Sequence, residues 1–329
     1  MKRFSRIIVE CACLADQKPM KQTVLLAPFA SPFAGHVSMS KFRKFLPPFL
    51  LLSPSIVLLL TFVHIPAIHT IYLSFFSTPK GRRPSKFKGL ENYQDMIADP
   101  VFWKVLGNNL IYAITTIPAS IIIALIMAQL VNSALPGRPF LRFSFFLPVV
   151  LPLIAVGNIW LFFYLPGFGL IDQIGSLFGL PNTNILGSSE TVLWGIVGVS
   201  IWKESGFYMI FFLAALQGIP RDLKEAAYIE GANNWQIFRR ITLPLITPTI
   251  LFISVIATIN AFIRIEHLFS MTQGGPNYNS ALLLYYLYEN AFVFWDTAYA
   301  IAQSVFLIVL LSIIGIGQIF LMDRRVHYQ

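Results

Sequence analysis

Ionisable side chains that interrupt long apolar stretches are the residues of this sequence best placed to do chemistry. Lys203 and Glu204 stand together in one such stretch, and Arg264 and Glu266 stand in another. Such groups are costly in an apolar environment, so they either mark a path for a polar solute or pair with one another to hold helices together. The sequence leaves both interpretations open. The complete set of candidate contact residues includes aromatic and amide neighbours: Trp202, Lys203, Glu204, Tyr208, Asn260, Phe262, Arg264 and Glu266.

The sequence contains no residue pattern typical of a metal site or of a catalytic nucleophile. The histidines show no paired ligand spacing, and even His64 and His69 have no carboxylate or cysteine beside them. Cys11 and Cys13 are separated by one residue without a second pair, which predicts free thiols. The sequence contains neither a Gly-x-Ser-x-Gly motif nor a Gly-rich phosphate-binding loop ending in Gly-Lys-Ser/Thr. We therefore expect a protein that is not an enzyme and that binds no metal or cofactor itself.

The composition predicts a membrane protein. Of 329 residues, 56% are apolar and 12% are charged, whereas a soluble domain carries about 25% charged residues. Mean hydropathy is +0.68, so much of the surface is expected to face lipid. The net charge of +9 lies in short gaps between apolar runs and forms no basic face interleaved with aromatic residues, which argues against nucleic-acid binding.

Six apolar stretches approach or exceed the roughly 20 residues that a helix needs to cross the hydrocarbon core. The sequence thus predicts an all-α, polytopic fold. Prolines inside these stretches predict kinks, which membrane helices tolerate. The expected spans are residues 45–63 with a possible extension to 76, then 105–131, 143–164, 191–216, 249–269 and 299–322.

The distribution of Lys and Arg predicts the orientation of the spans. One side holds sixteen: eight before the first span, two after the second, four after the fourth and two at the C-terminus. The other side holds six, all in the first outer loop or just after it. Because positive charge favours the cytoplasmic side, both termini are expected there. We expect a flexible cytoplasmic tail over residues 1–44, a transmembrane domain over 45–322 and a cytoplasmic C-terminal tail over 323–329.

Residues 220–248, called the polar loop below, form the most charge-dense segment of the second half of the chain. Asp222 and Glu225 have the spacing of a capping box, which predicts a helix start. Gly231 suits the left-handed residue that ends a helix. Asn233, with Gln236 three residues later, predicts the start of a second helix.

Side chains along the polar loop predict how it presents itself. Ala226 and Ala227 leave one helix face low, so another surface can approach closely. Trp235 and Phe238 lie three residues apart and predict an apolar ridge. Pro244 is expected to end the second helix. By these features alone the polar loop is equally typical of an amphipathic connector that lies on the membrane.

A resemblance favours a more specific interpretation. The polar loop resembles the EAA motif, which identifies permease subunits of binding-protein-dependent ABC importers. Glu230 departs from the usual Asp of the motif but keeps its charge. The residues that carry the resemblance are Glu225, Ala226, Ala227, Gly231, Ala232, Phe238, Ile241, Leu243, Pro244 and Pro248, preceded by Leu216, Ile219, Pro220 and Leu223.

Other segments resemble the carbohydrate-uptake branch of this family, which handles maltose, multiple sugars or glycerol 3-phosphate. The resemblance covers roughly residues 45–329. These segments are residues 87–93 in the first outer loop, Trp202-Lys203 in the fourth span, residues 272–276 after the fifth span, and the ending 326–329. The large extra outer domain of the maltose-type subunit is absent, because the first outer loop is too short.

The resemblance implies a type I ABC importer permease with six spans. Its polar loop would contain the coupling helix that seats in a cytoplasmic ATPase subunit, with Glu225 pairing with a basic group and Gly231 setting the bend. The implied partners are a second homologous permease, two ATPase subunits that carry ATP and Mg, and an extracellular solute-binding protein. The implied location is the inner membrane of a bacterium.

The resemblance also implies that the fourth and fifth spans line the solute path. The solute would be a sugar, a related polyol or a glycerol phosphate. Trp202, Tyr208 and Phe262 are then candidate stacking partners for a sugar ring, and Lys203 and Arg264 would suit a phosphorylated solute unless carboxylates already pair with them. Two rival classes remain: an ion-coupled secondary transporter, and a membrane-embedded enzyme, which should display clustered Asp or His residues near one interface.

Overall fold

The computed structural model describes residues 41–79, 84–133, 137–179 and 184–323, and most of these residues are helical, with no β-strand among them. The all-α prediction is confirmed for this part of the chain. The predicted tails 1–44 and 323–329 lie almost entirely outside it.

The elements are α2 (Lys41–Leu59), η1 (Leu60–His64), α3 (Ile65–Leu73), α4 (Glu91–Ala98), α5 (Pro100–Asn132), α6 (Arg138–Val150), α7 (Leu153–Phe163), α8 (Leu170–Leu177), α9 (Val192–Gln217), α10 (Arg221–Ile229), α11 (Asn234–Ile237), η2 (Phe238–Thr242), α12 (Leu243–Leu245), α13 (Thr247–Ile263), α14 (Glu266–Met271), α15 (Leu283–Tyr288), η3 (Glu289–Val293) and α16 (Thr297–Asp323), where η marks a π-helix.

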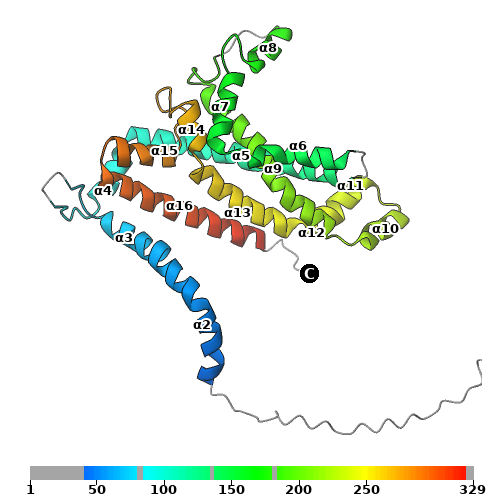
Figure 1. The fold of residues 1–329 in the computed structure, drawn as a ribbon, viewed down its shortest axis with the longest axis horizontal. Coiled ribbons are helices and arrows are strands. Elements are labelled where there is room, and N and C mark those ends of the chain that lie inside the picture. Colours follow the sequence, from blue (N-terminus) through cyan, green and yellow to red (C-terminus); the bar gives the residue numbers. More distant parts are fainter. Residues whose placement is uncertain (1–40, 80–83, 134–136, 180–183, 324–329) are drawn as a thin grey trace, which may run out of the picture. The chain divides into compact units, whose positions relative to one another are not determined.

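The chain divides into two units, Met1–Leu59 and Leu60–Gln329. The described part of the first unit is α2. The second unit contains every other element, and within it the long helices α5, α9, α13 and α16 run alongside one another (Figure 1).

Five of the six predicted spans appear as long apolar helical segments among the described residues. They cover Leu50–Leu73, Pro100–Asn132, Val192–Gln217, Thr247–Met271 and Thr297–Leu321. The second begins five residues earlier than predicted because Asp99 caps it: the Asp99 carboxylate accepts a hydrogen bond from the Val101 amide at 2.8 Å. Pro100 occupies the first turn, where a missing N–H costs nothing.

The predicted third span is broken rather than continuous. It consists of α6 and α7, which meet at an angle of 103°, so the number of crossings is six only if this bent pair counts as one span. Leu151 and Pro152, at the break, adopt extended backbone angles. The prolines of this stretch predict a kink, but the sequence does not indicate a bend of this size.

Two other prolines, Pro66 and Pro244, follow π-turns. η1 ends two residues before Pro66 and η2 ends two residues before Pro244. Because proline has no N–H and its ring crowds the preceding turn, a wider turn just before it relieves the strain. The prediction that Pro244 ends its helix is therefore wrong, since the chain continues through η2 into α12 with the Leu243 amide bonded to the Phe238 carbonyl.

The core of the second unit consists of two main apolar clusters along the α5–α9 pair. One cluster includes Phe102, Ile196 and Leu283, and the other includes Ala124, Phe212 and Ile253. Small side chains such as Ala124 and Ala128 let α5 approach its neighbours closely. Polar side chains gather between the two clusters, and they form the site described next.

Candidate functional site

A small polar pocket lies between α5, α9 and α13. Its side chains recur at helical spacing: residues 112, 116 and 120 on α5, and residues 200, 204 and 208 on α9. Residues three, four or eight apart lie on one helix face, so three helices turn one polar face each toward a common point. The residues that define this polar pocket are Tyr112, Thr116, Ser120, Leu153, Ser200, Glu204, Tyr208, Ala257, Asn260, Arg264 and His267, with Ile117 and Ala261.

An ion pair is the centre of the polar pocket. Arg264 donates to the Glu204 carboxylate, and the Asn260 amide donates to the same carboxylate at 3.2 Å and to the Tyr208 hydroxyl at 3.3 Å. The two charged side chains are 13% (Glu204) and 38% (Arg264) exposed. The pair therefore neutralises both charges inside the pocket, which is the condition under which ionised groups persist away from water.

A second polar chain crosses the pocket. The Tyr112 hydroxyl donates to the Ser200 hydroxyl oxygen at 2.7 Å, and the Ser200 hydroxyl donates in turn to the Ile196 carbonyl at 2.9 Å. His267 Nε2 lies 3.4 Å from the same Ser200 oxygen. Two buried atoms that line the pocket, Ser120 Oγ and His267 Nδ1, have no hydrogen-bond partner among the described residues. A water molecule or a ligand that bonded to these atoms would be favourable, because a buried polar group without a partner lowers stability by about 1–3 kcal/mol.

The pocket is narrow in this conformation. The volume that a water-sized molecule can occupy is about 20 Å³, which is enough for one water molecule.

The structure brings four of the eight predicted contact residues together: Glu204, Tyr208, Asn260 and Arg264 all line the polar pocket. Lys203 lies on another face of α9 because adjacent helical residues are rotated by about 100°. Its ammonium group donates to the carbonyls of Pro148 and Leu151 at 2.8 and 2.7 Å. The predicted alternative in which Lys203 pairs with Glu204 or Glu266 does not occur here.

The other three predicted contact residues also lie away from the pocket lining. Phe262 is 1% exposed within an apolar cluster, so its ring has no free face for a sugar in this structure. Trp202 is 42% exposed and its ring lies 5.6 Å from that of Trp160. Glu266 is exposed at the first turn of α14.

Sequence reasoning missed five polar residues of the pocket, although a signal for all five was present. Tyr112, Thr116 and Ser120 repeat every fourth residue, and Ser200 continues the row of Glu204 and Tyr208. Rows of polar residues at this spacing in an apolar helix indicate a single polar face. His267 continues the row of Asn260 and Arg264 at helical spacing, although in the structure it lies on the short helix α14, after the chain turns at Arg264 and Ile265.

The polar loop folds into α10, α11, η2 and α12. Gly231 has φ +84°, and the Gly231 and Ala232 amides donate to the Tyr228 and Ala227 carbonyls at 3.0 and 2.9 Å. These two bonds form a Schellman motif, so the predicted left-handed helix end is confirmed. A β-carbon at Gly231 would meet no atom within 4 Å, so the backbone angle and not the space requires glycine here.

The second predicted capping box is present and the first is absent. Asn233 Oδ1 accepts from the Gln236 amide at 2.8 Å, and Gln236 Oε1 accepts from the Asn233 amide at 2.9 Å. α10, in contrast, begins after Pro220 with no side-chain cap, so the predicted Asp222–Glu225 box is wrong. The preceding proline fixes the chain direction at this end, and Asp222 contributes only a favourable charge in the first turn.

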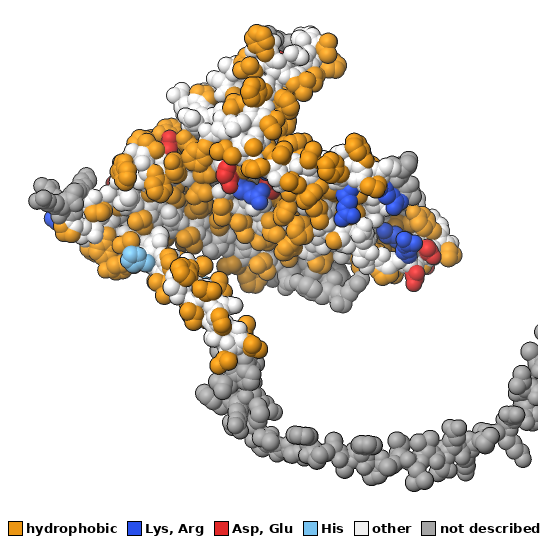
Figure 2. Space-filling view, viewed as in Figure 1, with side chains coloured by type: hydrophobic (Ala, Val, Ile, Leu, Met, Phe, Trp, Pro, Cys, Tyr) orange, Lys and Arg blue, Asp and Glu red, His pale blue; other side chains and the backbone are white. Residues whose placement is uncertain are grey.

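The polar loop presents apolar side chains to the outside. Ile229 is 88% exposed, Trp235 64% and Tyr228 54%, and the Trp235 and Phe238 rings lie 5.6 Å apart. Charged side chains gather at the same end of the molecule, over α10–α12 (Figure 2). Glu225, Glu230 and Ala226 are exposed as well, whereas Ala227, which was expected to leave a low face, is buried within the loop.

No group of His, Cys, Asp or Glu side chains among the described residues has the geometry of a metal site. The fold and the site together define a polytopic membrane protein with an internal polar pocket and a surface-exposed pair of short helices.

The family described as the binding-protein-dependent transport system inner membrane component matches residues 117–328. The chain therefore belongs to this family of multi-pass inner-membrane transport permeases.

Relatives and solved structures agree with this family. The chain is 35% identical to a probable ABC transporter permease protein, YurN, of Bacillus subtilis, over 81% of this chain and 92% of the relative. It is 33% identical to the sulfoquinovosyl glycerol transport system permease protein SmoG of Agrobacterium fabrum, over 78% and 83%. A bacterial ABC transporter involved in the import of alginate has the same fold, with a TM-score of 0.75 at 23% identity, over 87% of this chain and 99% of that one.

Proposed function

We propose that this chain is a permease subunit of an ATP-driven importer and that its polar loop receives the force from a cytoplasmic ATPase subunit. One observation carries the proposal. The loop folds into a capped, bent pair of helices that exposes Ile229, Tyr228 and Trp235, although exposed apolar groups of this size are costly in water. A protein partner that covers them would remove that cost.

The assembly that fits this role contains two permease subunits, two ATPase subunits that bind ATP and Mg, and an extracellular solute-binding protein. The family description names a binding protein as a requirement of these transport systems. The polar pocket lies on one side of a path whose other wall would come from the second permease. Both termini would lie in the cytoplasm of a bacterium, as the distribution of Lys and Arg predicts.

The solute is proposed to be a sugar or a related polyol, with a glycerol phosphate less well matched. The polar pocket offers hydroxyl, amide and imidazole groups that suit sugar hydroxyls, and its two charges already neutralise each other. Lys203 is fully engaged by backbone carbonyls. A phosphate would thus enter a poorly hydrated site without a spare cation, which is unfavourable. The relatives do not separate the two solute classes, since the probable starch degradation products permease AmyD of Thermoanaerobacterium thermosulfurigenes is 31% identical over 84% of this chain and the sn-glycerol-3-phosphate permease UgpA of Agrobacterium fabrum is 30% identical over 85%. The preference for a neutral solute therefore rests on the charges of the pocket.

Substitution of Gly231 tests the coupling role. Asn tolerates positive φ, and a side chain at this position meets no neighbouring atom, so Gly231→Asn is expected to fold and to retain most uptake. Gly231→Asp has the same shape but adds a negative charge at the expected ATPase contact, and it is expected to abolish uptake. Both variants should insert in the membrane at wild-type levels. Normal uptake by a well-expressed Gly231→Asp variant would refute the coupling role.

A further inference from the structure

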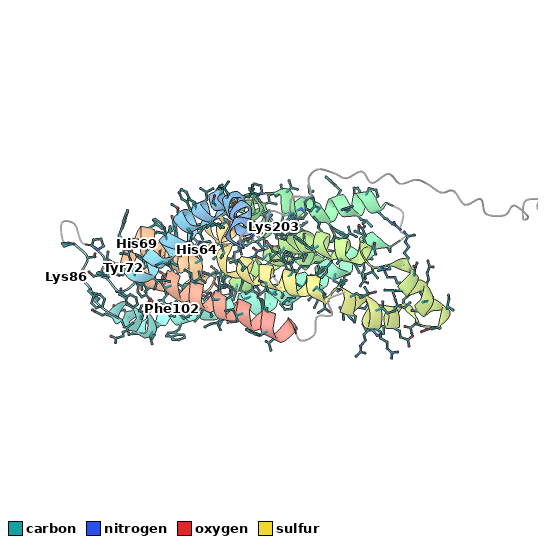
Figure 3. All side chains as sticks on the ribbon, turned by 90° about the horizontal axis from the view of Figure 1, so that it is seen from below. His64, His69, Tyr72, Lys86, Phe102 and Lys203 are labelled. Atoms are coloured by element: carbon teal, nitrogen blue, oxygen red, sulfur yellow. The ribbon has the colours of Figure 1, made fainter. Side chains whose placement is uncertain are left out.

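Lys203 carries a buried ammonium group whose acceptors are all backbone carbonyls. The side chain is 5% exposed, and Nζ donates to the Pro148, Val149 and Leu151 carbonyls at 2.8, 3.4 and 2.7 Å. Figure 3 marks Lys203 among the helices, whereas Lys86 lies on an end loop. The three acceptors lie at the break between α6 and α7.

These carbonyls lack their ordinary helical partners. In a continuous helix the Pro148 carbonyl would accept from the amide of residue 152, but residue 152 is a proline and has no N–H. Leu151 leaves the helix with φ −72° and ψ 135°, so the last turn of α6 ends without a cap from its own chain. A buried backbone carbonyl without a hydrogen-bond donor is unfavourable, most of all in a membrane protein. A donor from another helix is therefore required.

Lys203 meets this requirement in both charge and position. The last carbonyls of a helix carry partial negative charge, which favours a cation. Glu204, the nearest carboxylate in sequence, is already bonded to Arg264, so it does not compete for the ammonium group. α9 can approach α6 closely because Gly206, one turn after Lys203, has no side chain: a β-carbon there would lie 2.2 Å from the Phe145 carbonyl oxygen.

The break also determines where α7, the helix that follows it, lies relative to the polar pocket. α7 begins at Leu153, which lines the pocket beside Glu204. α7 then packs against α14, where a β-carbon at Gly157 would lie 2.1 Å from Ser270 Oγ. The direction in which α7 leaves the break thus decides whether Leu153 reaches the pocket wall.

We propose that Lys203 is a positioning residue: its ammonium group holds the α6–α7 break by satisfying the orphaned carbonyls, and it thereby places the first turn of α7 on the wall of the polar pocket. The inference does not depend on the proposed function, since stability and local accessibility test it without any solute.

Thiol labelling tests the placement of α7 in the purified assembly. In a Cys11→Ser/Cys13→Ser background, Leu153→Cys reports the pocket wall, and Gln94→Cys at an exposed position on α4 reports a site outside the pocket. Lys203→Met, which removes every donor, is expected to change the labelling rate of residue 153 by N-ethylmaleimide by about tenfold, and Lys203→Arg, which keeps donors, is expected to restore it. The rate at residue 94 should stay unchanged. An equal labelling rate at residue 153 with and without the Lys203→Met substitution would overturn the proposal.

Thermal stability tests the hydrogen bonds themselves. Lys203→Met should lower the unfolding midpoint, whereas Ser205→Ala, whose hydroxyl donates to the Ile201 carbonyl of its own helix, should have a small effect. Pro152→Ala supplies the missing N–H, so the loss caused by Lys203→Met should be smaller in that background. The same comparison can be made on the amount of assembled protein if the Lys203→Met variant proves too unstable to purify. An equal or larger loss in the Pro152→Ala background would overturn the proposal.

Discussion

At the residue scale, the two cations predicted to suit a phosphorylated solute, Lys203 and Arg264, are both bonded to groups of the protein itself. Arg264 is bonded to Glu204, and Lys203 is bonded to the carbonyls of the broken span. Charge in a sequence indicates where a polar interaction must occur, because an unpaired buried charge is too costly to persist. It does not indicate the partner, and here one cation has a carboxylate partner and the other has backbone carbonyls instead.

The Glu204–Arg264 pair gives a test at this scale. Glu204→Gln or Arg264→Gln alone leaves one unpaired charge, and each should destabilise the permease by about 1–3 kcal/mol, less than for a fully buried pair because water reaches Arg264. The double variant should be more stable than either single variant. Thermal unfolding of the purified assembly measures this order.

The same variants separate two roles for Arg264. Uptake by Arg264→Gln should fall equally for neutral sugars and for glycerol phosphates, because Glu204 already neutralises the charge of Arg264. A selective loss of phosphorylated solutes would instead assign Arg264 to solute recognition. Ser304→Ala, whose hydroxyl donates to the Ala300 carbonyl of its own helix, serves as a control.

At the element scale, side-chain caps determine where helices end, and side-chain hydrogen-bond networks determine which helices pack together. The Asp99 carboxylate caps α5 and also accepts from the Tyr286 and Tyr299 hydroxyls at 2.6 and 2.7 Å, which joins α5 to α15 and α16. Partial burial opposes the charged form of Asp99, but these hydrogen bonds outweigh it and lower the pKa of the carboxyl group below its ordinary value.

Asp99→Asn tests this hydrogen-bond network around the Asp99 carboxylate. Asn keeps the capping oxygen but loses the charge, so stability should fall by about 1 kcal/mol at neutral pH. A lowered pKa in the folded state means that the carboxylate stabilises the fold above its unfolded value of about 3.9 and that this contribution is lost as pH falls through the folded value. The difference between the wild type and Asp99→Asn in thermal unfolding should therefore shrink below about pH 4. Asp95→Asn, at an exposed position on α4, is the matched control for removal of a surface carboxylate.

At the scale of the whole molecule, the source of energy distinguishes the proposed importer from its rivals. Membrane vesicles that contain the complete assembly should lose uptake on depletion of ATP and should retain it when an uncoupler removes the proton gradient. The chain alone, reconstituted in liposomes, should not accumulate solute, because it would lack the ATPase that drives the change in access. Uptake that collapses with the uncoupler and survives ATP depletion would identify an ion-coupled carrier instead.

The sequence alone determined the class of the fold and the position of most elements. Long apolar stretches leave a chain no alternative to helices in lipid, since each backbone group must be bonded within its own segment. Local signals at Gly231 and at Asn233 with Gln236 were equally decisive, because caps and left-handed turns depend on neighbours a few residues away.

Only the tertiary structure decided the partners of the polar groups. The bonds from Lys203 to Pro148 and Leu151 span about fifty residues of sequence, and those from Arg264 to Glu204 span sixty. Such pairings depend on which helix faces meet and on the size of the bend at Pro152, and both follow from packing between distant segments. Helical periodicity could have identified the polar row of Tyr112, Thr116 and Ser120, but it could not have shown that α9 and α13 turn their own polar rows toward it.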